Sequence, residues 1–165
     1  MTPEIIVPEP DVLPLPAPLG LFRFLLHLTF FLHLVAMNLL LGGTIIAVVE
    51  WIRGRDGTPP ARLARRLGRM LPIAMPLTVT LGVAPLLFLQ VIYGHLFYTS
   101  SVIMAWPWFL VVPILIVVYY LAYMIAARSK HGGRANWILV DILAGGLLVI
   151  ALIYVNNMTL ALRPA

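Results

Sequence analysis

The chain of 165 residues contains no cysteine. This absence excludes disulfide bonds, iron–sulfur clusters held by cysteine and the C-x-x-C-H attachment of a c-type haem, so any haem in this protein would be bound non-covalently. Charged residues are also scarce, at 10% of the chain against 62% hydrophobic residues, and the mean hydropathy is +1.01. A short chain of this composition is typical of one membrane-embedded helical bundle rather than of a soluble domain.

Long segments lack Asp, Glu, Lys and Arg altogether, and their lengths predict membrane spans. One run covers residues 24–49 and another covers the 58 residues 70–127. A helix rises about 1.5 Å per residue and the hydrocarbon core of a bilayer is about 30 Å thick, so the first run holds one span and the second holds two. We therefore expect an all-α integral membrane protein, a bundle of four transmembrane helices at about residues 19–51, 70–94, 102–128 and 136–162.

Two connecting segments have distinctive compositions. The first 18 residues contain six prolines and no Lys or Arg. They lack the positively charged start of a signal peptide, so we expect an extended arm at residues 1–18 ahead of a membrane domain at residues 19–165. Glycine, histidine, tyrosine and serine cluster at residues 93–101. This composition predicts the turn between the second and third spans.

The basic residues are concentrated in two loops. Of the eleven Lys and Arg residues, six lie in residues 53–69 and three in residues 128–134. A net charge of +5 can indicate nucleic-acid binding, but clustering in alternate loops is the asymmetry that sets membrane orientation, so we expect no nucleic-acid partner. The positive-inside rule places both loops in the cytoplasm and both termini on the outer, periplasmic side of a bacterial inner membrane.

Two histidines, His27 and His33, lie within the charge-free run of the first span. Ionisable side chains at membrane depth are costly and indicate a functional site. His33 is the deeper of the two, and Met37 follows one turn later on the same helix face. A neutral imidazole directed into a dry bundle can bind haem iron, which makes His33 the candidate metal ligand. A histidine that donates one hydrogen bond to a neighbouring helix is an equally good interpretation.

Further polar residues are expected in the outer half of the membrane. Arg23 precedes His27 by one turn, so both could hold a haem propionate or a quinone carbonyl, although an arginine that extends to the interface is the commoner arrangement. His95, in the expected turn, could be an opposite axial ligand or a quinone partner, whereas an exposed histidine is more common there. Gln90 is a further candidate, and such amides more often form hydrogen bonds between helices. Motifs of soluble catalysis are absent, so no catalytic residue is predicted.

The spacing R-x9-H-x8-G of Arg23, His33 and Gly42, followed by R-R-L-G-R and by L-T-V-T-L-G-V, resembles the opening of subunit I of the cytochrome bd-type oxidases. The segment GVAPLLFLQVIYG at residues 82–94 is similar to the stretch that leads out of that family's second span. The resemblance implies that His33 is an axial haem ligand near the outer surface. Because the family's subunit has many more helices, it implies a divergent, truncated relative that keeps the first four-helix bundle.

These features favour a membrane-embedded subunit of a respiratory or photosynthetic electron-transfer complex that binds haem b, a quinone or both near the outer side. Its partners would be other membrane subunits and the lipid bilayer. The alternative is a cofactor-free structural subunit that packs against other membrane subunits. A stand-alone four-helix enzyme similar to the membrane protoporphyrinogen oxidases ranks below both, because that likeness rests on topology alone.

Overall fold

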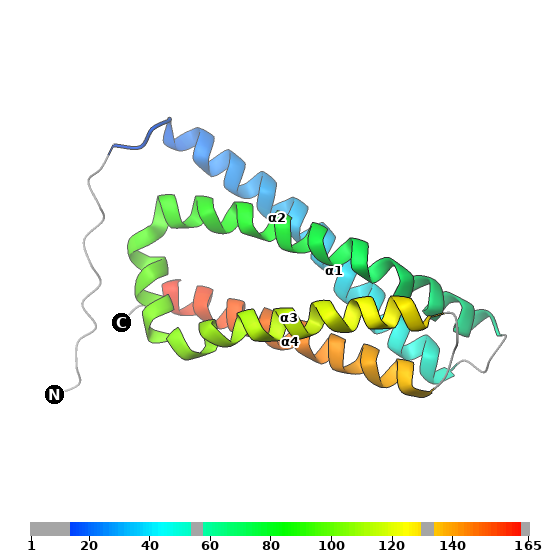
Figure 1. The fold of residues 1–165 in the computed structure, drawn as a ribbon. Coiled ribbons are helices and arrows are strands. Elements are labelled where there is room, and N and C mark those ends of the chain that lie inside the picture. The colour runs from blue at the N-terminus through cyan, green and yellow to red at the C-terminus, as the bar shows by residue number, and fades with distance from the viewer. Residues whose placement is uncertain (1–13, 54–57, 130–133, 163–165) are drawn as a thin grey trace.

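The computed structural model describes residues 14–53, 58–129 and 134–162, and every element of regular structure within these ranges is a helix. The helices are α1 (Leu19–Arg53), α2 (Pro59–Ile103), α3 (Ala105–Arg128) and α4 (Arg134–Leu162), shown in Figure 1. All four are long and apolar enough to cross a membrane, as predicted, which is the pattern of a multi-pass membrane protein. Most of the arm expected at residues 1–18 lies outside the described residues.

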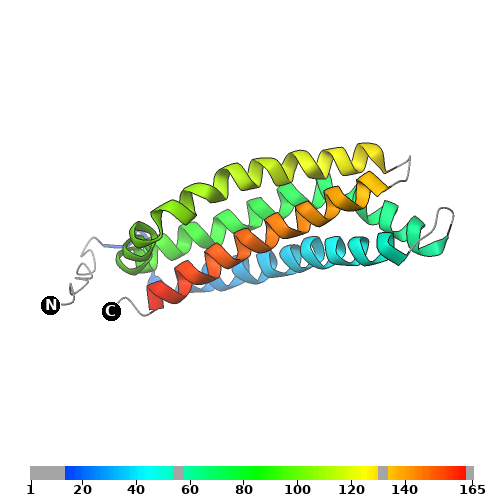
Figure 2. The same cartoon turned by 90° about the horizontal axis from the view of Figure 1, so that it is seen from below.

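Successive helices run in opposite directions, which brings arginines to one end of the bundle (Figures 1 and 2). Arg53 lies in the last turn of α1, Arg128 lies in the last turn of α3, and the arginine-rich segment opens α2. We call this end the basic end. The other end, which holds Leu19 and Leu162, is called the terminal end.

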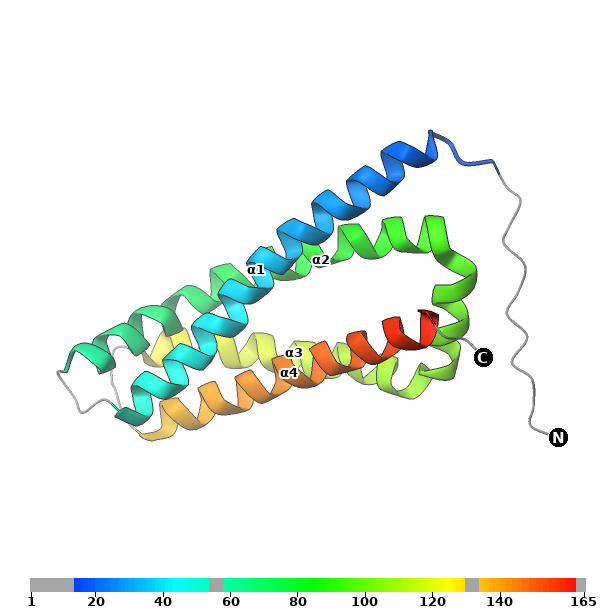
Figure 3. The same ribbon diagram turned by 180° about the vertical axis from the view of Figure 1, so that it is seen from behind.

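The tightly packed core lies in the half of the bundle nearer the basic end. All four helices contribute to it, through Leu40, Ala47, Leu71, Met75, Val118, Leu121, Ala122, Ile125, Val140 and Leu143. Toward the terminal end, the first half of α1 and the adjoining part of α2 diverge from α3 and α4 (Figures 1 and 3). Phe24 and Phe31 of α1 are each 62% exposed there. Lipid tails are as apolar as these side chains and can cover them in a membrane.

The second helix is longer than expected, because the segment predicted as a turn at residues 93–101 is helical. α2 has 45 residues and begins at Pro59 rather than near residue 70. Its backbone leaves helical geometry at Tyr93 (φ −125°, ψ 31°), directly before Gly94, a residue type common at helix kinks. Residues 95–103 contain neither proline nor glycine, so the chain stays helical and crosses the terminal end of the bundle (Figure 1). Met104 alone separates α2 from α3.

Gly146 brings α4 close to α3, and this contact makes a testable prediction. A Cβ atom at Gly146 would lie 2.6 Å from Cγ2 of Val118. Val118 is 1% exposed, and a β-branched side chain has one strongly preferred rotamer in a helix, so it cannot swing aside. We expect Gly146→Ala to lower the free energy of unfolding in detergent by about 1–3 kcal/mol relative to a glycine-to-alanine change without a clash, measured by denaturant titration.

Gly145→Ala is the matched control for this substitution, because no atom lies within 4 Å of a Cβ at Gly145. It should be neutral or stabilise the protein by up to about 1 kcal/mol, the difference in helix propensity between alanine and glycine. Equal effects of the two substitutions would contradict the close contact between Gly146 and Val118.

Candidate functional site

His33 lies near the middle of α1 and connects it to α2. Its Nδ1 atom is 3.1 Å from the backbone carbonyl oxygen of Thr78. Because a carbonyl oxygen can only accept a hydrogen bond, Nδ1 carries the proton and is the donor of this hydrogen bond to Thr78. In the neutral imidazole, Nε2 is then unprotonated and has a free lone pair.

Gly82, one turn after Thr78 on α2, supplies the surface on which the His33 ring rests. A Cβ atom at Gly82 would lie 2.7 Å from Cε1, 3.0 Å from Nδ1 and 3.3 Å from Nε2 of His33. This edge of the ring therefore occupies space that any side chain at position 82 would fill. His33 itself is half-buried, while Ala36 and Leu40, further along α1, are 6% and 3% exposed. The ring thus stands at the border between the tight core and the part where the helices diverge.

The geometry around His33 suits both interpretations made from the sequence. Histidines that bind metals commonly donate their other ring N–H to a backbone carbonyl, which fixes the tautomer and the orientation of the ring. The Thr78 bond has this form and leaves Nε2 for a ligand. The same bond, together with the contact to Gly82, also joins α1 to α2 without any ligand.

Met37, the second candidate on this face, is half-buried one turn after His33 on α1. Residues four positions apart lie next to each other on the same side of a helix. Met37 can therefore approach a group bound at His33 only from the same side as the histidine. It cannot supply the opposite axial ligand of one iron.

His27 and Arg23 do not join His33. His27 is exposed, and its Nδ1 donates a hydrogen bond to the backbone carbonyl of Arg23, one turn earlier on the same helix, at 2.6 Å. The side chain of Arg23 is also exposed. Six residues make about 120° less than two full turns of a helix, so the side chains of His27 and His33 point about 120° apart. The two histidines therefore occupy different faces of α1.

Gln90 and His95 lie on either side of the kink in α2. The hydroxyl of Tyr98 donates to Oε1 of Gln90 at 3.4 Å, and this contact links the two arms of the kinked helix. Gln90 thus makes a contact within its own helix instead of one between helices. His95 is half-buried, and in the described part of the chain its ring makes no hydrogen bond. Its backbone carbonyl accepts a bond of 2.7 Å from the hydroxyl of Thr99.

A polar and aromatic cluster near the terminal end was not identified as a site from the sequence. Trp108 of α3 packs edge-on against Tyr154 of α4, with ring centroids 4.7 Å apart, and against Phe97 of α2 at 6.0 Å. Asn157 is fully buried and donates from Nδ2 to the Ser101 hydroxyl at 3.3 Å. An asparagine in an apolar span is the sequence signal for such a bond between helices.

Two atoms of this cluster have hydrogen-bonding capacity to spare. Nε1 of Trp108, a donor, and Oδ1 of Asn157, an acceptor, are both buried without a partner among the described residues. Buried polar groups are nearly always satisfied in folded proteins, by protein or by water. A water molecule at each atom is one way in which these groups are satisfied in folded proteins.

The contacts of His33 thus form the best-defined candidate site, from Thr78 and Gly82 on α2 and His33 on α1. Among the described residues, no three His, Asp or Glu side chains gather to hold a metal ion by themselves. Comparisons of the chain with protein families, with curated proteins and with solved structures found no match.

Proposed function

We propose that this protein is a membrane-embedded subunit of an electron-transfer complex and that it binds haem b through Nε2 of His33. The observation that carries the proposal is the hydrogen bond from Nδ1 of His33 to the Thr78 carbonyl, which orients the ring and leaves Nε2 unprotonated. A titratable side chain in the middle of a membrane span is costly and favours a functional role. The resemblance of the Arg23, His33 and Gly42 spacing to cytochrome bd-type subunits supports the same residue.

Each residue of the site has a defined task in this proposal. Thr78 fixes the ring orientation, and the missing side chain at Gly82 leaves the space that the His33 ring itself occupies. Haem b, when bound, supplies one-electron redox chemistry. His27 and Met37 belong to the same helix as His33, so any further residue that would hold the haem would come from another helix or from a partner subunit.

The proposal includes an orientation in a bacterial inner membrane. Arginines at the ends of α1 and α3 and at the start of α2 lie together at the basic end. The positive-inside rule assigns such an end to the cytoplasm. The terminal end would then face the periplasm, with the His33 site about midway between the two surfaces.

The test is a reduced-minus-oxidised absorption spectrum, with haem extraction, of the protein purified with its native partners. We expect a b-type band in the wild-type protein and its loss in His33→Ala. His27→Ala is the matched control, because it removes an exposed histidine from the same helix, and it should retain the band. A wild-type protein without a b-type band, or a His33→Ala variant that keeps this band, would contradict the proposal.

A cofactor-free structural subunit is the second candidate, favoured by the packing of His33 on Gly82. In this case His33 serves only to hold α1 against α2. The protein would co-purify with other membrane subunits in fixed stoichiometry but would carry no colour. His33→Gln, which keeps a hydrogen-bond donor, would then preserve assembly, whereas a haem ligand would be lost by the same change.

A further inference from the structure

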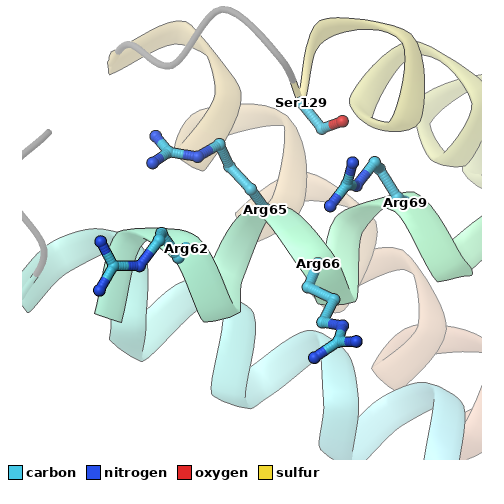
Figure 4. A pocket seen from close by; sticks show the side chains of 5 residues that line it. All are labelled: Arg62, Arg65, Arg66, Arg69 and Ser129. Carbon is cyan, nitrogen blue, oxygen red and sulfur yellow. The ribbon is translucent and has the colours of Figure 1, made fainter. Parts of the chain in front are cut away.

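A hollow lies at the basic end, away from the His33 site. It has a volume of about 470 Å³ and lies between the start of α2 and the end of α3. Its lining consists of Arg62, Arg65, Arg66, Arg69 and Ser129 (Figure 4). Small-ligand sites commonly have volumes of roughly 300–1,000 Å³. Among the described residues that line the hollow there is no carboxylate, so its lining is positively charged.

The four arginines follow one another along α2 at spacings of three and four residues, and Arg66 extends away from Ser129 in Figure 4. The buried face of α2 at this level is made of small residues, Ala61, Ala64 and Gly68. This division lets α2 pack closely on its neighbours and directs the arginines outward. In Figure 4, Arg69 extends toward Ser129, and Arg65 lies on the same side of the helix.

Ser129 closes the hollow from the α3 side but does not supply its donors. Its side chain is 1% exposed, and its hydroxyl donates to the carbonyl of Ala126 at 2.7 Å. The N–H groups considered for an anion are therefore those of the guanidinium groups of Arg66 and Arg69. Guanidinium presents planar, paired donors that match the oxygen atoms of a phosphate.

We propose that this hollow binds the phosphate group of an anionic phospholipid. The arginines directly precede the apolar part of α2, at the level where lipid headgroups lie if the four helices span a membrane. Met70 and Ile73, which follow the arginines on α2, are 58% and 73% exposed and provide an apolar surface for acyl chains. Inorganic phosphate offers the same oxygen atoms but has no acyl chains, so these apolar neighbours favour the lipid.

The experiment is native mass spectrometry of the full chain in detergent, titrated with phosphatidylglycerol, phosphatidylcholine or sodium phosphate. We expect phosphatidylglycerol to bind at lower concentration than phosphatidylcholine. The double substitution Arg66→Gln and Arg69→Gln should weaken phosphatidylglycerol binding by roughly tenfold or more, because each basic residue near an anionic lipid surface strengthens binding several-fold.

The matched control is the double substitution Arg53→Gln and Arg128→Gln, which removes the same charge from the same end without changing the lining of the hollow. It should alter binding by less than about threefold. Equal weakening by both double variants, or equal binding of the two lipids by the wild-type protein, would overturn the site. Sodium phosphate that displaces phosphatidylglycerol at equal concentration would overturn the lipid as the source of the phosphate.

Discussion

Gly82→Ala should displace the His33 ring from α2 and weaken the packing of α1 on α2. The new Cβ atom would lie 2.7 Å from Cε1 of His33. Either the ring moves and loses its bond to Thr78, worth about 0.5–1.5 kcal/mol, or the helices separate at an overpacking cost of about 1–3 kcal/mol. The better helix propensity of alanine offsets up to about 1 kcal/mol of this loss, so we expect a net destabilisation of at most about 2 kcal/mol in a detergent unfolding titration.

Gly42→Ala is the control for Gly82→Ala, because a Cβ at Gly42 would have no atom within 4 Å. It should be neutral or slightly stabilising. The spectrum of the native complex separates the two proposed functions. With haem on His33, Gly82→Ala changes or removes the b-type band while Gly42→Ala preserves it. With a structural subunit, only the unfolding titration responds. Equal stability of the two variants would contradict the close packing of the His33 ring on Gly82.

Leu143→Ala should be much more destabilising than Leu152→Ala, although both truncate a leucine of α4. Leu143 is fully buried in the core, whereas Leu152 is 60% exposed. In a membrane, moving an apolar group from the protein interior to lipid changes the free energy little, because both surroundings are apolar. The cost of truncating a leucine therefore comes from lost packing contacts. We expect Leu143→Ala to cost about 2 kcal/mol, at the lower limit for leucine truncations in water, and Leu152→Ala to cost nothing measurable.

The measurement for this pair is unfolding of the purified protein, followed by the yield of any subunits that co-purify with it. If the proposed partner subunits exist, a Leu152→Ala variant that unfolds normally but loses them would identify the exposed face of α4 as a subunit interface. Similar losses of stability in both variants would instead contradict the position of the core near the basic end.

Some features of this protein follow from local sequence and could be predicted. The four spans depend on the length of runs without charge, and the gathering of arginines at one end follows once those spans alternate in direction. The corner at the terminal end could not be predicted in this way. Residues 93–101 have the composition of a turn, but the contacts of Tyr98 with Gln90 and of Phe97 with Trp108 hold this segment as a helix.

The candidate site illustrates the same division. The sequence alone identifies His33 as an unusual residue, because a titratable group within an apolar run is costly wherever it points. Only the tertiary structure shows that its ring donates to Thr78 and rests on Gly82. Its place on a different face of α1 from His27 already follows from their spacing of six residues. The hydrogen bond from Asn157 to Ser101 and the position of Ser129 beside the arginines likewise depend on how the helices pack against each other.

The sequence by itself therefore determined that this chain has four segments long and apolar enough to cross a membrane, which end of the bundle is basic, and which histidine lies nearer the middle of the first segment. The physical reason is that hydrophobic length and charge are properties of each segment alone. The tertiary structure decided which helix faces meet, because side-chain direction depends on contacts between residues far apart in the chain. At Gly82 that contact rests on the absence of a side chain, which no pattern along α1 could reveal.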